Sequence, residues 1–175
     1  MKIIKNVFYF SVICIVALLS VLVYLGYLPV VIVCSVEQSN TDYPFQKGDT
    51  LSPFAEFNFE EGKWEAVVVI SYNDLNVLDK SIPRVTCLQT NSVELLRHMK
   101  EKWRFIVTGG DLATVTSGFY LKKDGVLVFE SGIVFDPKVE GFQSSKFGWI
   151  TPVDGYKITN DIKQFNRAWS IIKFF

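Results

Sequence analysis

A run of twenty residues without a charged side chain, residues 8–27, constrains the fold of this chain more than any other feature. With a rise of about 1.5 Å per residue, a helix of that length matches a hydrocarbon core roughly 30 Å thick. Aromatic residues stand at both ends of the run, as they do at membrane interfaces. We therefore predict a single transmembrane anchor helix over residues 8–27, between a tail of residues 1–7 and a domain of residues 28–175.

The charges around the run predict its orientation. Lys2 and Lys5 precede it, and no further lysine or arginine occurs before Lys47. Because basic residues stay on the cytosolic side, we expect a cytosolic N-terminus. The chain has no Asn-x-Ser/Thr sequon, which favours a bacterial envelope over a eukaryotic secretory route. The expected location is the bacterial inner membrane, with residues 28–175 in the periplasm.

Two other interpretations of the run stay open. A cleaved signal peptide also begins with basic residues, although its apolar part usually spans only about 7–15 residues. A buried core helix is the second alternative, because a long apolar run also fits the inside of a domain. Lipid attachment at Cys34 is set aside, because Val33 before it is not a small residue.

The rest of the chain has the composition of one folded domain. The sequence is 49% hydrophobic and 15% aromatic, which is too apolar for a disordered segment. Roughly 140 residues remain beyond the anchor, the size of a single domain. With Lys2 and Lys5 set apart, 16 of the 18 basic residues stand against 18 acidic ones. This balance argues against a nucleic-acid partner, which would require a basic surface.

Alternating patterns predict a mainly antiparallel sheet. Asp124-Gly125 joins two alternating runs, residues 117–123 and 126–131, and this dipeptide favours a type I′ turn. The two runs are therefore expected to pair as a hairpin. Similar patterns predict strands at residues 30–36, 54–60, 64–72, 84–89, 104–108 and 147–150, with 54–60 and 64–72 paired as a second hairpin.

Periodic apolar residues predict one or two helices beyond the anchor. Residues 93–102 have a helical apolar face, and Asn91-Ser92 precedes them as an N-terminal cap. Residues 158–169 also carry apolar side chains at helical spacing, but their assignment stays ambiguous. The expected fold class is α+β, with one compact domain after the anchor.

Two cysteines are candidates for a disulfide. Cys34 and Cys87 both lie in predicted strands beyond the anchor. An oxidising compartment permits a bridge between them if their Cα atoms lie within about 7 Å. The alternative is two free thiols that pack as small apolar side chains. With three cysteines and one histidine in the chain, no metal site is expected.

No local pattern carries the chemistry of an active site. His98 falls among charged residues on the polar side of the predicted helix, which is typical of a solvated surface residue. Ser170 and Lys173 have the Ser-x-x-Lys spacing of some acyl-transfer enzymes, but so short a pattern arises by chance. We therefore expect no catalytic residues, no cofactor and no small-molecule substrate.

The distribution of charge is the strongest functional signal. Residues 37–65 hold seven acidic residues against two lysines, a net charge of −5, beside Phe54, Phe57 and Phe59. Such a surface would steer a basic protein partner and anchor it through aromatic contacts. The alternative is a solvated hairpin whose aromatic residues face the core. The residues predicted to bind the partner are Glu56, Glu60 and Glu61.

An anchor, one domain and an acidic segment together favour a membrane-anchored, non-enzymatic binding protein of the bacterial envelope. Its expected form is an immunity or inhibitor protein that neutralises a toxin acting in the periplasm, by analogy with small anchored domains that lack catalytic groups. One alternative is an accessory subunit of an envelope membrane complex. The other is a small membrane-anchored hydrolase that uses Ser170 with Lys173, or His98.

Overall fold

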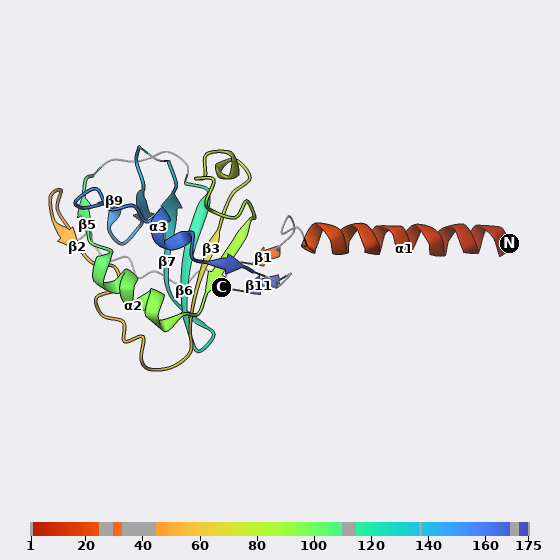
Figure 1. Ribbon diagram of the computed structural model, residues 1–175, viewed down its shortest axis with the longest axis horizontal. Helices are drawn as coiled ribbons and strands as arrows, with labels where there is room; N and C mark the ends of the chain where they lie inside the picture. Colours follow the sequence, from red (N-terminus) through yellow and green to blue (C-terminus); the bar gives the residue numbers. More distant parts are fainter. Residues whose placement is uncertain are drawn as a thin grey trace.

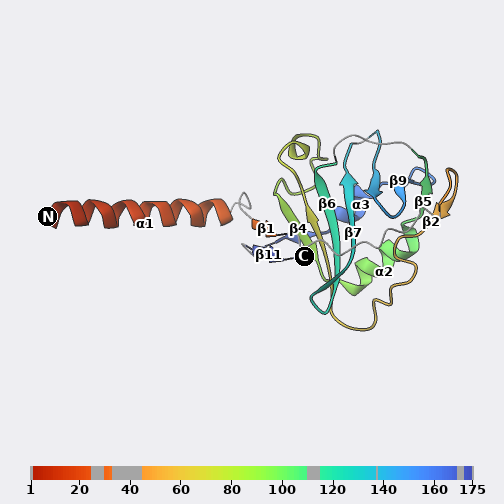
Figure 2. The ribbon, with the colours of Figure 1, turned by 180° about the vertical axis from the view of Figure 1, so that it is seen from behind.

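An apolar helix projects away from a folded domain in the computed structural model, which describes residues 2–24, 30–32, 45–109, 115–136, 138–168 and 172–174 (Figures 1 and 2). The helix is α1 (Lys2–Tyr24), and no residue of its span Lys5–Leu22 is buried. Among the described residues it is the one helix long and apolar enough to cross a membrane. Because it is exposed along this span, α1 is not a core helix of the domain.

One antiparallel sheet organises the domain. Nine strands form it in the part of the chain that the structure describes, in the order β10-β4-β3-β6-β7-β8-β9-β5-β2. Strands β6 to β9 follow one another in both sequence and space, whereas β3 and β4 extend the sheet on one side and β5 and β2 on the other. The strands are β2 (Thr50–Leu51), β3 (Trp64–Val69), β4 (Cys87–Thr90), β5 (Phe105–Val107), β6 (Ser117–Lys123), β7 (Val126–Val134), β8 (Gly141–Ser144), β9 (Gly148–Pro152) and β10 (Asn166–Arg167).

The central hairpin forms where the sequence predicts it. Strands β6 and β7 pair antiparallel on either side of Asp124-Gly125, with Lys123 opposite Val126. The φ angles of Asp124 and Gly125 are 52° and 84°, and two positive values in succession are what a type I′ turn requires. The second strand continues to Val134, past the expected end at residue 131, because it also pairs with β8.

Helix α2 (Val93–Lys102) has the predicted bounds. The Ser92 hydroxyl accepts a hydrogen bond from the backbone N–H of Leu95 at 3.1 Å, which caps the first turn. Leu95, Leu96 and Met99 are buried against the sheet. Together with the short helices α3 (Thr159–Ile162) and η1 (Asp74–Asn76), the sheet and α2 form an α+β fold, as expected.

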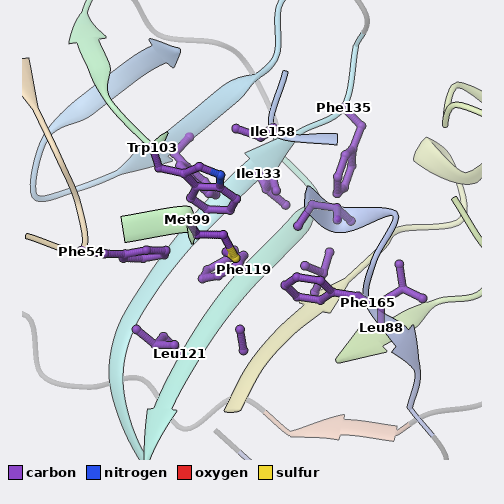
Figure 3. Packing of buried hydrophobic residues seen from close by; sticks show 14 of the residues in the cluster. Phe54, Leu88, Met99, Trp103, Phe119, Leu121, Ile133, Phe135, Ile158 and Phe165 are labelled. Atoms are coloured by element: carbon purple, nitrogen blue, oxygen red, sulfur yellow. The ribbon is translucent and has the colours of Figure 1, made fainter. Parts of the chain in front are cut away.

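Aromatic side chains fill the space between α2 and the sheet. Figure 3 shows Phe54, Met99 and Trp103 gathered over Phe119 of β6. The ring centroid of Phe54 lies 5.3 Å from that of Trp103 and 5.6 Å from that of Phe119. Rings at such distances add attraction to the gain from burying their apolar surface. The core therefore lies on the face of the sheet that α2 and α3 cover (Figure 1).

A second, small pairing joins a segment that follows α1 to the C-terminal end of the described chain. Strand β1 (Val30–Ile32) pairs in parallel with β11 (Ile172–Phe174), and both lie between α1 and the large sheet (Figure 1). The Arg167 guanidinium donates a hydrogen bond to the backbone carbonyl of Tyr24 near the end of α1. In the large sheet, β4 lies on the side that faces α1, and β2 lies on the opposite side (Figures 1 and 2).

Several sequence predictions differ from the structure, among them the second hairpin, because β3 ends at Val69 and pairs with β4 and β6. Residues 54–60 form turns and not a strand, because Phe54 and Phe59 both turn into the core. The strand expected at 84–89 begins only at Cys87, after Pro83 and a bend. In the segment whose assignment the sequence left ambiguous, the described residues 158–168 contain the single-turn α3 and the edge strand β10. Beyond Ile32, the strand expected at 30–36 lies outside the described residues.

The cap of α2 gives a direct test of the local fold. Replacing Ser92 with alanine removes the acceptor for the Leu95 N–H and should lower the free energy of unfolding by about 1 kcal/mol. Ser92→Thr keeps a hydroxyl that can accept from the Leu95 N–H and donate to Glu94, so it should stay close to wild type. Denaturant unfolding of the full chain in detergent, followed by tryptophan fluorescence, measures both. Equal stability of the two variants would contradict the cap.

Candidate functional site

Residues 52–61, named here the ridge, form successive turns between β2 and β3. The backbone N–H of Ala55 donates to the Ser52 carbonyl, and that of Phe57 donates to the Phe54 carbonyl, each at 3.1 Å. The side chain of Phe54 is 0% exposed and that of Phe59 is also buried. Two buried rings thus hold the ridge on the core, and the residues between them are left at the surface.

An apolar groove lies on one side of the ridge. Its volume is about 240 Å³, and the exposed pair Glu56 and Lys146 stands at its rim. Lys146 belongs to the turn between β8 and β9, so the groove joins the ridge to the sheet. The apolar residues that line the groove are Phe45, Leu51, Pro53, Ala55, Phe129 and Phe147.

A second groove of about 400 Å³ lies between the ridge and α2, and it is named here the polar groove after the charged side chains that line it, which are Glu60, Arg97, Lys100 and Glu101. The Arg97 guanidinium donates from Nε to Glu60 Oε1 at 2.9 Å, and its Nη2 donates to the same oxygen. The hydrogen bond with Glu60, together with the charge of that carboxylate, raises the pKa of Arg97. Lys100 Nζ donates to the carbonyl of Phe57 at 2.7 Å. Basic side chains of α2 therefore already occupy this groove.

The three predicted partner-binding residues have different surroundings. Glu60 is bound by Arg97, whereas Glu61 accepts a hydrogen bond from the neutral Asn58 amide at 2.8 Å. Glu56 Oε1 lies 3.9 Å from Lys146 Nζ, and these side chains are 71% and 64% exposed. Solvent and salt screen so long and exposed an ion pair. Glu56 is therefore the carboxylate most available to a partner.

The three phenylalanines of the acidic segment do not form the exposed aromatic surface that the sequence suggests. Phe54 and Phe59 face the core, so they position the ridge and do not meet a partner. Phe57 is half-buried and lines the polar groove. Part of the apolar lining beside Glu56 comes from other elements, with half-buried Phe129 from β7 and buried Phe147 from the turn before β9.

A buried carboxylate, which sequence reasoning missed, lies below α2. Asp161 is 1% exposed, and its Oδ2 accepts hydrogen bonds from Trp103 Nε1 at 2.6 Å and from the Tyr156 hydroxyl at 2.7 Å. Burial, and then the hydrogen bond with Asp161, raise the pKa of the Tyr156 phenol far above its usual value. The phenol therefore remains a proton donor to Asp161 across the neutral range.

His98 lies at the outer edge of this cluster. Its Nε2 is 3.5 Å from Asp161 Oδ1 and 3.4 Å from the Tyr156 hydroxyl, while its side chain is 46% exposed. In the described part of the chain these are its polar neighbours, and neither is a serine or cysteine nucleophile. The cluster links α2 to residues 156–161. The polar side of α2 gives no sign of it in the sequence, because the partners are far away along the chain.

The remaining candidates fall partly on residues that the structure does not describe. Cys87 is buried in β4, but Cys34 lies outside the described residues, so the Cys34–Cys87 bridge stays a prediction. Ser170 also lies outside them, whereas Lys173 belongs to β11. A search of the described residues finds no group of three or more histidine, cysteine or acidic side chains placed to hold a metal ion.

Removing the buried carboxylate should destabilise the domain. Asp161→Ala leaves the Trp103 N–H and the Tyr156 O–H without their acceptor, and a stranded buried donor costs about 1–3 kcal/mol, so we expect a loss of roughly 3 kcal/mol. Glu101→Ala on the exposed side of α2 serves as the control and should change little. Adding Tyr156→Phe to Asp161→Ala should recover part of the loss, because one stranded donor disappears. If denaturation shows that the losses of unfolding free energy from Asp161→Ala and Tyr156→Phe simply add in the double variant, the cluster is contradicted.

Compared with protein-family models, with curated proteins and with solved structures, the chain matches none. Its function must therefore follow from its own geometry. Among the described surfaces, the ridge and its two grooves bring exposed apolar and charged side chains together, whereas the polar groups of the Asp161 cluster bind one another. The ridge is the candidate functional site.

Proposed function

We propose that the chain is a membrane-anchored binding protein of the bacterial envelope that holds a protein partner on the ridge. The observation that carries this proposal is the apolar groove rimmed by Glu56 and Lys146. Protein interfaces concentrate their binding energy in apolar pockets that a polar rim surrounds. A groove of this kind on an exposed, turn-rich segment suits recognition of another protein.

The anchor part of the proposal rests on α1. No residue of its span Lys5–Leu22 is buried, and so much exposed apolar helical surface is stable in a bilayer and not in water. Lys2 and Lys5 at its start support a cytosolic N-terminus and a periplasmic domain. Tethering would keep the domain where a toxin reaches the inner membrane, so an immunity or inhibitor role is the specific form that we propose.

An accessory subunit of a membrane complex is the second candidate. The β1–β11 pairing and the hydrogen bond from Arg167 to Tyr24 join the domain to the base of α1. Because the helix is held in this way, contacts between α1 and partner helices would also position the domain. In that case binding would depend on α1, whereas an immunity protein would bind through the ridge.

Orientation can be tested with a reporter enzyme that is active only outside the cytosol. Fused after Phe175, it should be active, because the basic residues before the anchor keep the N-terminus inside. The membrane-bound product should also keep the mass of the uncleaved chain. A shorter product would show a cleaved signal peptide, and activity of a cytosolic reporter alone would reverse the topology.

Binding through the ridge can be tested by charge reversal. Partners should be captured from envelope membranes with the full chain and identified by mass spectrometry, and their association rates should then be measured. Glu56→Lys with Glu61→Lys should slow association of a basic partner, and high salt should slow the wild type similarly, because both weaken electrostatic steering. Asp79→Lys, a reversal of an exposed carboxylate that lines neither groove, is the control. An association rate unchanged by both the double reversal and salt would remove the ridge as the binding surface.

A further inference from the structure

We infer that the partner inserts one apolar side chain into the apolar groove and places a neighbouring basic side chain on Glu56. This inference rests on the proposed function and specifies the chemistry of the segment that the ridge would take. Three features of the groove carry it: its size, its walls and the unequal pairing of the carboxylates on the ridge.

The size of the groove points to a single side chain. Pockets for small molecules measure about 300–1,000 Å³, and this groove, at about 240 Å³, falls below that range. Aromatic and aliphatic side chains form its walls, so the occupant gains from leaving water. One large apolar side chain of a protein partner meets both conditions, with the rest of the partner lying across the ridge.

The ion pairs of the ridge carboxylates indicate which residue of the partner should stand next to the inserted apolar side chain. Glu60 is already held by Arg97, whereas within the described residues the charged partner of Glu56 is Lys146, through a long, exposed contact. A guanidinium or ammonium from a partner would form a shorter, charge-assisted hydrogen bond with Glu56, and Lys146 would return to solvent. An acidic neighbour would have to pair with Lys146 while facing the carboxylates of the ridge. The basic neighbour is therefore favoured.

The polar groove is the weaker site for the same segment. Entry there would break the hydrogen bonds of Arg97 to Glu60 and of Lys100 to Phe57. The exposed Arg97–Glu60 pair contributes little, but losing the half-buried hydrogen bond from Lys100 to the Phe57 carbonyl costs free energy, which the incoming segment would have to offset. The apolar groove requires no such loss beyond the weak Glu56–Lys146 contact.

The inference can be tested with three dipeptide probes on the full chain in phospholipid nanodiscs. The probes are N-acetyl-phenylalanyl-argininamide, N-acetyl-phenylalanyl-glutamic acid amide and N-acetyl-alanyl-argininamide. The readout is the ¹³C-methyl NMR signals of Leu51, which lines the apolar groove and not the polar one, and of Ala55, which lines both. The Phe-Arg probe should shift these signals at millimolar concentration, and it should bind about threefold to fivefold more tightly than the Phe-Glu probe. The Ala-Arg probe should shift them least.

Three variants assign the effect to the groove and to Glu56. Glu56→Gln should remove the preference for arginine over glutamate, whereas Glu61→Gln, the same change on a carboxylate that does not line the groove, should keep it. Ala55→Phe should block all three probes, because the new ring would fill the groove. Since Ala55 is exposed, this substitution should leave the unfolding transition near that of the wild type.

Three results would overturn the inference: unshifted Leu51 and Ala55 signals, a preference for the Phe-Glu probe, or equal losses in Glu56→Gln and Glu61→Gln. Such a result would leave the proposed function standing if the captured partner still responds to reversal of the ridge charges. A partner indifferent to that reversal would instead remove the proposed function, whatever the dipeptides do.

Discussion

The burial of Phe54 is the contact on which the exposed features of the domain depend. Its ring stacks on Trp103, which follows α2, and lies against Phe119 of β6, so one side chain joins the ridge, the helix and the sheet. Within the ridge, backbone hydrogen bonds close only single turns. Both grooves therefore keep their shape because the core holds this ring, and a change at Phe54 would move both at once.

The fold could be predicted from the sequence wherever a local signal determines it. Asp124-Gly125 and the Ser92 cap act within a few residues, so the central hairpin and α2 follow from them directly. Residues 54–60 show the limit of this reasoning. Alternating side chains over 55–59 resemble a strand, but the core takes both Phe54 and Phe59, and an extended chain cannot turn two residues at that spacing to the same face. Tertiary packing overrides the pattern here.

The candidate site was predictable only in part, for a related reason. Charge counting locates the acidic segment, yet Glu56, Glu60 and Glu61 look alike in the sequence. Their differences come from Arg97 on α2 and Lys146 beyond β8, which only the folded chain brings to the ridge. The Asp161 cluster is similar, since its donors lie on elements that are distant along the chain. Sequence indicates which groups are charged, whereas topology decides which of them remain available.

The two strands at the margins of the large sheet, β10 and β2, are each two residues long. A long, flat margin presents a row of backbone donors and acceptors onto which a neighbouring chain can add its own strand. Chains anchored in one membrane are crowded into two dimensions and meet repeatedly in similar orientations. Margins this short offer little template for such polymerisation. The proposed membrane-anchored binding protein can therefore accumulate at a membrane surface without the sheets of neighbouring copies joining. Selective recognition then depends on side chains.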